Sequence, residues 1–286
     1  MAFWKRLPVL IKAVLIGVTV ATAGTGPWAL LSGANLKYLS SVPWSVPPTA
    51  VYLWFFWRYL QGAGWPRSTA EARRVSLRAN RLSDDVWGTA LFAGVLGLAA
   101  VVLFLRVMSR LVVVPRQQLP DLSQIPVATL LVILLMSAIV AGVVEEASFR
   151  GYMQGSIERR HGPVVAILVT GTMFGFLHFT HPEVTLVLMP YFLAVGAVYG
   201  ALTYLTSSIL PALFLHAGGN FLSGLGVLAG GTDLETPASA PLIWETGADA
   251  SFWMSVAALL VVGAAVVWAY SALATVARKG TVVPTA

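Results

Sequence analysis

The sequence has 286 residues, of which 57% are apolar and only 10% are Asp, Glu, Lys or Arg. Soluble domains carry about 25% charged residues, and disordered chains combine low hydrophobicity with high charge, so both classes are excluded. The chain contains no cysteine, which excludes disulfides, thiolate metal sites and a cysteine nucleophile. The mean hydropathy of +0.79 and the long apolar runs instead indicate an integral, polytopic membrane protein.

Apolar stretches of the length needed to cross a bilayer, roughly 20 residues, recur along the whole chain. They predict an all-α membrane helix bundle of about eight transmembrane helices, forming one domain over residues 1–286. The predicted spans are 9–31, 47–61, 86–108, 126–148, 163–180, 184–206, 209–228 and 251–275. The second is the weakest, because it is short, begins at Pro47 and Pro48 and contains Arg58.

The distribution of basic residues predicts the orientation. The net charge of +6 is compatible with nucleic-acid binding, but the basic residues cluster between the spans, so we interpret it as positive-inside charge and predict no nucleic-acid partner. A cytoplasmic N-terminus puts eleven Lys and Arg residues inside and four outside: Lys37, Arg106, Arg110 and Arg116. The polar segment 62–85 then becomes a basic, partly helical cytoplasmic loop, and the acidic loop 229–250 lies outside. We predict a multi-pass protein of the cytoplasmic (inner) membrane with both termini in the cytoplasm.

The first span has an alternative interpretation. Lys5 and Arg6, the apolar stretch that follows, and Ala21-Thr22-Ala23 resemble a signal peptide with an A-x-A cleavage site. Lys12 within the stretch and the continuation of the apolar run through Leu31 favour a retained span.

Charged residues stand at the end of the fourth span. An ionisable group at membrane depth costs several kcal/mol and is kept only when it is paired or functional. Glu146 and Arg150 are four residues apart, so on a helix they share a face and can form an ion pair. Glu145 is rotated by about 100° from Glu146 and is left without that arginine. The alternative is that the span ends here and that its charges are solvated.

His178 ends the run Phe174-Gly175-Phe176-Leu177-His178 in the fifth span, and a lone histidine in an apolar helix is more often structural than catalytic. His161-Gly162-Pro163 predicts a turn between the fourth and fifth spans. Glu145 lies 17 residues before Gly162, and His178 lies 16 residues after it. At 1.5 Å per residue, both are roughly 25 Å from the turn along antiparallel helices, so they can face each other.

His216 and Asn220 lie four residues apart on one face of the seventh span, next to two glycines that permit close helix approach. Alone, they can be a hydrogen-bonded packing pair. With Glu145 and His178 at similar depth, they could instead hold a water beside a carboxylate base, with donors placed for an oxyanion. The residue types equally permit a zinc site formed by Glu145, His178 and His216.

These residues resemble a known family. Glu145-Glu146-x-x-x-Arg150, Phe174-x-x-x-His178 and His216-x-x-x-Asn220 are similar, in type and order, to the three signature motifs of the CAAX protease and bacteriocin-processing (CPBP, or Abi) membrane proteins. That family includes the type II CAAX prenyl endopeptidases. The motifs cover a core of about 126–228.

The resemblance implies a glutamate-dependent intramembrane endopeptidase that acts without metal or cofactor on a membrane-associated protein or peptide. By this resemblance, Glu145 activates the attacking water with help from His178, and His216 and Asn220 stabilise the oxyanion. Glu146 and Arg150 are supporting residues.

Three alternatives were weighed against this interpretation. Other intramembrane proteases need a Gly-x-Ser site, a His-Glu-x-x-His motif or two membrane aspartates, and none is found in the predicted spans. A proton- or cation-coupled transporter is disfavoured because the chain has no inverted repeat and its membrane charges cluster. A non-catalytic scaffold or immunity protein that retains the motifs stays open.

Overall fold

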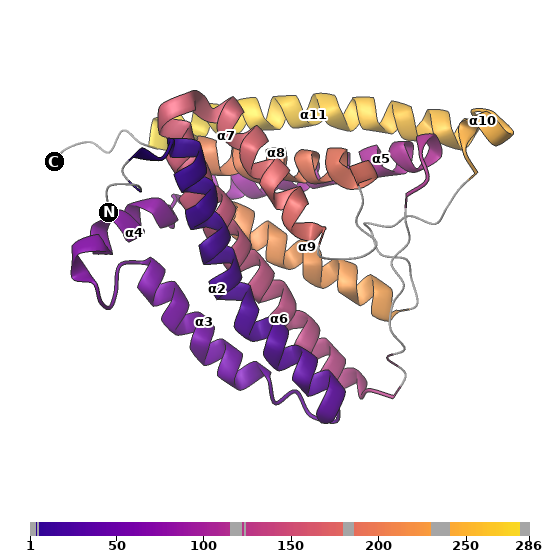
Figure 1. The fold of residues 1–286 in the computed structure, drawn as a ribbon. Helices are drawn as coiled ribbons and strands as arrows, with labels where there is room; N and C mark the ends of the chain where they lie inside the picture. Colours follow the sequence, from indigo (N-terminus) through magenta and orange to yellow (C-terminus); the bar gives the residue numbers. More distant parts are fainter. Residues whose placement is uncertain are drawn as a thin grey trace.

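The computed structural model describes residues 4, 6–114, 122, 124–179, 186–229 and 241–280. Within these ranges the chain is helical and contains no strand, and its long helices pack as a bundle (Figure 1). The long helices are α2 (Val9–Tyr38), α3 (Val46–Leu60), α5 (Asp84–Leu111), α6 (Val127–Glu145), α7 (Gly155–His178), α8 (Met189–Thr206), α9 (Leu210–Leu228) and α11 (Ala250–Gly280). The predicted all-α polytopic class is confirmed.

Six helical segments of the described chain are long and apolar enough to cross a membrane, rather than about eight. The difference has two causes. The second predicted span forms α3, whose 15 residues are too few for a full crossing. The fourth and fifth predicted spans are joined into one helical segment, Val127–His178, of 52 residues.

The predicted turn within that segment is present at Gly162. Its φ of 79° and ψ of 168° interrupt the helical backbone, and Pro163 begins the helical run that returns. A positive φ favours glycine because a Cβ would be strained there. The chain therefore runs from α6 beyond the level of the acidic residues before it turns back toward His178.

A π-helix, η2 (Glu146–Gln154), joins α6 to α7, and all nine of its residues are buried. It lies between two apolar cores. Phe149 and Met153 pack into the core formed with α5, α7 and α8, whereas Ala147 and Tyr152 pack into the core formed with α2, α3 and α6. π-Helical turns are rare in proteins, and those that occur are often found at functional sites. The π-helix here begins at Glu146, so it points to the acidic residues as a candidate functional site.

The segment between α3 and α5 is partly helical, as predicted, with η1 (Arg67–Thr69) and α4 (Ala70–Leu77). Arg73 is buried and donates to the carbonyls of Tyr59, Ala63 and Pro66 at 2.8, 2.9 and 3.0 Å. The segment is therefore folded onto the bundle. Arg73, which the sequence placed in a basic loop, instead holds the backbone of this segment together through its hydrogen bonds.

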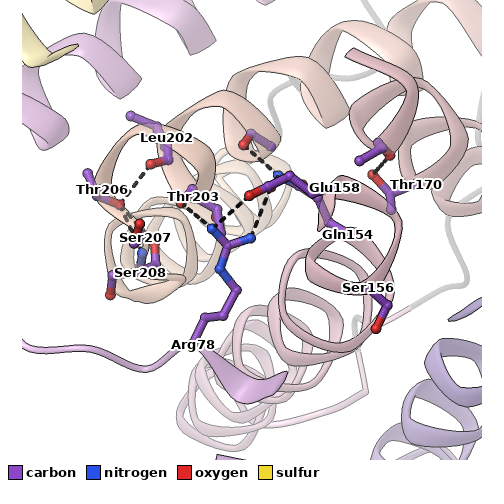
Figure 2. Close-up of polar contacts among 12 residues, drawn as sticks. Arg78, Gln154, Ser156, Glu158, Thr170, Leu202, Thr203, Thr206, Ser207 and Ser208 are labelled. Atoms are coloured by element: carbon purple, nitrogen blue, oxygen red, sulfur yellow. Dashed lines mark hydrogen bonds and ion pairs between the residues drawn. The ribbon is translucent and has the colours of Figure 1, made fainter. Parts of the chain in front are cut away.

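Arg78, the residue after α4, anchors this segment to α7 and α8 (Figure 2). Its guanidinium donates to Glu158 at 3.1 Å and to the Thr203 carbonyl at 3.3 Å. The Gln154 amide donates to Glu158 and, at 2.9 Å, to the Gly200 carbonyl. These bonds fix the end of the π-helix against α8.

At the opposite end of α5, Arg110 donates to Asp249 at 3.2 Å and to the Pro241 carbonyl at 2.8 Å. Arg110, one of the four basic residues that the predicted orientation places outside, is therefore paired with an acidic residue just before α11. The beginning of α2 and the end of α11 lie toward one end of the molecule (Figure 1). That arrangement agrees with chain ends on one side of the membrane, while the sidedness itself stays a prediction.

Candidate active site

A cavity of about 280 Å³ lies among α5, the end of α6, α7, α8 and α9 and is walled mainly by apolar and aromatic side chains. Glu145, His178, His216 and Asn220 all line it. These residues come from three different helices and are separated by as many as 75 positions in the sequence, yet they line one cavity. The predicted depth match between Glu145 and His178 corresponds to this shared cavity.

Glu146 lies behind the cavity wall and accepts hydrogen bonds from two other site residues. Its Oε1 accepts a hydrogen bond from Arg150 Nη1 at 3.0 Å and another from His216 Nδ1 at 2.8 Å. The Glu146 and Arg150 side chains are 0% and 1% exposed, so the ion pair predicted from their spacing is present and fully buried. The bond to His216 crosses to another helix and was not predicted from the sequence.

Glu145 faces the cavity. Its Oε2 lies 3.7 Å from His216 Nε2, and its side chain is 18% exposed. Within the described part of the chain, that buried oxygen has no hydrogen-bond partner. The two adjacent glutamates differ in their surroundings. Oε1 of Glu146 accepts hydrogen bonds from Arg150 and His216, whereas Glu145 lines the cavity. Among the described residues, Oε2 of each glutamate has no hydrogen-bond partner.

The hydrogen bonds of the two histidines define which ring nitrogen carries a proton. His178 Nδ1 lies 2.7 Å from the Phe174 carbonyl, which can only accept, so Nδ1 is the donor. In neutral His178, Nε2 is then an acceptor. His216 Nδ1 likewise donates to the Glu146 carboxylate, so its Nε2 is the nitrogen near Glu145.

Aromatic rings position these groups, and the sequence did not single most of them out. Tyr199 stacks on His216 with 5.2 Å between ring centroids and an interplanar angle of 15°. Phe174 lies 4.6 Å from the His178 ring, and the Arg150 guanidinium carbon lies 4.9 Å from the Phe174 centroid. The Phe192 ring centroid also lies 4.6 Å from that of His178. Tyr199 lies between Gly196 and Gly200 in an apolar span, and this pattern is the sequence feature from which its role could have been predicted.

The zinc site that the residue types permit would need Glu145, His178 and His216 to converge on one ion. Over the residues that the structure describes, no three His, Asp or Glu side chains are arranged as a group that could hold a metal ion. Glu145, His178 and His216 line one cavity without forming such a group.

The fold and this cavity define a polytopic membrane protein in which a carboxylate, two imidazoles and an amide line one cavity. Residues 127–222 match the family model described as type II CAAX prenyl endopeptidase Rce1-like. The match spans all three motifs and confirms, over these residues, the resemblance to the CAAX protease and bacteriocin-processing family. No curated protein and no solved structure matches the chain.

Proposed function

We propose that this protein is an intramembrane endopeptidase that hydrolyses a peptide bond of a membrane-associated protein or peptide with water activated by Glu145. The observation that carries the proposal is that Glu145 and His216 approach within 3.7 Å in a cavity that His178 and Asn220 also line. The match of this segment to a CAAX endopeptidase family model supports the same class of reaction.

In the proposed first step, the Glu145 carboxylate takes a proton from a water while the water oxygen attacks the scissile carbonyl carbon. His178 Nε2 accepts the second water hydrogen and orients the lone pair. The carbonyl π electrons move to oxygen and form a tetrahedral oxyanion. In the second step the C–N bond breaks, and the proton held by Glu145 passes to the leaving nitrogen. A positioned carboxylate base of this kind contributes typically about 10²–10⁴-fold to the rate.

His216 and Asn220 supply the donors for the oxyanion in this proposal. Because His216 Nδ1–H is already committed to Glu146, donation from Nε2 requires the imidazolium form. The carboxylates of Glu146 and Glu145 flank the ring and stabilise its positive charge. Glu146, held in turn by Arg150, is therefore a positioning residue that acts through His216.

The cavity walls indicate the character of the substrate segment. Leu98, Val101 and Val102 of α5 face Tyr191 and Val195 of α8 across the space. An apolar lining favours a hydrophobic side chain beside the scissile bond. The proposal does not specify a prenyl group.

The test compares membranes of cells that express the wild type, Glu145→Gln or the control Glu71→Gln, which alters an exposed glutamate of α4. Quantitative N- and C-terminal peptidomics should reveal termini that depend on the wild type and persist with Glu71→Gln. We expect Glu145→Gln to lower their formation by at least about 10²-fold, with unchanged membrane insertion. Identical termini in all three samples would instead support the scaffold or immunity alternative.

Chelation separates the carboxylate mechanism from the zinc alternative. We expect processing by the purified protein to persist after dialysis against a strong chelator, because the proposed base is the carboxylate itself. Activity that disappears and returns on addition of zinc would overturn the metal-independent part of the proposal.

A further inference from the structure

A second cavity, of about 420 Å³, lies between the beginning of α2 and the beginning of α7, away from the candidate active site. The α2 wall is formed by Val9, Lys12, Ala13 and Ile16, which share one helical face. The α7 wall is formed by residues that are three and four positions apart: Ser156, Arg159 and Arg160. Three basic side chains and a hydroxyl therefore converge on one space.

Among the residues that the structure describes, no acidic side chain lines this cavity. The nearest glutamate in sequence, Glu158, points in the opposite direction from Ser156 and is held by Arg78 (Figure 2). Across the described residues, no carboxylate lies within ion-pair distance of Arg159 or Arg160. The charges of Arg159 and Arg160 are thus not neutralised by these parts of the protein.

The surroundings of the cavity are apolar and exposed. Val9 and Ile16 are each 36% exposed on α2, and beyond the break at Gly162, Val164 is 69% exposed. In a membrane protein such surfaces face lipid chains, and the basic residues lie at the helix ends, where a span meets the headgroup layer. A free phosphate would match the charge but not the apolar rim.

We propose that this cavity binds the headgroup phosphate of an anionic phospholipid, whose acyl chains lie on the adjoining apolar surface. Basic pockets between transmembrane helices recognise such headgroups, and each Lys or Arg near an anionic surface contributes to the attraction. The two arginines and Lys12 hold the phosphate, and Ser156 donates a hydrogen bond to it. This assignment is independent of the proposed protease activity.

Native mass spectrometry of the detergent-solubilised full chain tests the assignment. The probes are phosphatidylglycerol, phosphatidylcholine with the same acyl chains, and inorganic phosphate. We expect one phosphatidylglycerol to be retained in preference to phosphatidylcholine, with no displacement by millimolar phosphate. Arg159→Gln/Arg160→Gln should weaken retention at least roughly tenfold, whereas Arg67→Gln/Arg81→Gln, which removes the same charge from exposed positions, should not.

Equal retention by Arg159→Gln/Arg160→Gln and the wild type would overturn the proposal. So would equal loss in both double variants, which would mean a general charge effect, or displacement by phosphate, which would mean a free-anion site. Thermal unfolding verifies that the variants are folded. If the double variant is unfolded, Lys12→Gln provides the same comparison from the α2 side, where unchanged retention would again overturn the proposal.

Discussion

Two Arg–Glu pairs in the molecule have the same chemistry and different surroundings. Glu146 and Arg150 lie within one helical segment and are 0% and 1% exposed, among the rings that line the candidate site. Arg78 and Glu158 join the segment after α4 to α7, and their side chains are 11% and 17% exposed. We refer to this region, which includes the contact between Asn80 and Ser207, as the rim of the bundle. The first pair shares its carboxylate with His216, and the second shares its groups with Gln154 and a backbone carbonyl.

The two pairs differ in burial and in whether they contact a residue of the candidate site. Removing a charge at the rim leaves a partner that water can reach, so mainly local packing is lost. Removing a charge at the site leaves a carboxylate or guanidinium buried without compensation and also releases an imidazole. We therefore expect substitutions in the two pairs to separate stability from activity.

The largest effect is expected from Arg150→Ala. Breaking a fully buried pair by removing one partner costs about 3–5 kcal/mol, because the remaining charge stays desolvated. Reversible unfolding in mild detergent measures this loss, and Glu146→Gln/Arg150→Ala should recover part of it by removing the orphaned carboxylate. Stability equal to that of the wild type would show that Glu146 has another source of compensation and would contradict the assigned role of the pair.

Two asparagines, one in the candidate site and one at the edge of the bundle, should respond differently to substitution. Asn220 lines the cavity, and removing one oxyanion donor typically costs about 10²–10³ in rate. Asn220→Ala should lower kcat by that factor with little change in stability. Asn80 donates to the Ser207 carbonyl at the rim, so Asn80→Ala should lower stability and leave kcat unchanged. The same response in both variants would remove the distinction between site and rim.

The sequence was sufficient for features set by local periodicity. Apolar length predicted the helices, Gly162 predicted the break, and the spacing of Glu146 and Arg150 predicted their pair. The candidate site was foreseen as far as matched depth along antiparallel helices can specify it.

The remaining features depend on rotations and contacts that spacing does not contain. The bond from His216 to Glu146 joins residues 70 positions apart and requires both helix rotations to be known. The π-helix changes which backbone groups pair without changing the apolar pattern. Arg110 was predicted only as an outside basic residue, because its partner, Asp249, lies 139 positions away and local spacing cannot identify it.

At the rim, Arg78→Met is expected to lower stability by about 1–2 kcal/mol. Hydrogen bonds to charged groups contribute about 1.5–3 kcal/mol, and the partial exposure of this pair reduces that value. Denaturant unfolding should detect the change, and Arg81→Met, an exposed neighbour, serves as the control. A loss of stability as large as that of Arg150→Ala would mean that the partly exposed pair and the buried pair are energetically equivalent, which would contradict the role assigned to burial.

The smallest effect concerns the exposed end of the molecule. The hydrogen bond from Arg110 lowers the pKa of Asp249, whose side chain is 54% exposed. The stabilisation is therefore present above the ordinary pKa of aspartate and is lost as pH falls through the lowered value. Thermal unfolding between pH 7 and 3 should show a slightly smaller acid response in Asp249→Asn than in the wild type.

Glu71 provides the matched comparison for this acid response, because the hydrogen bond from Arg74 also lowers its pKa. Those two residues are three positions apart on α4, so their contact can form in local helix without the folded bundle. Asp249 and Arg110 meet only when the end of α5 and the beginning of α11 are brought together in the folded bundle. Linkage depends on the pKa difference between folded and unfolded states, so Asp249→Asn should change the pH dependence more than Glu71→Gln. The reverse order would mean that the contact between Arg110 and Asp249 persists after unfolding or does not form in the membrane.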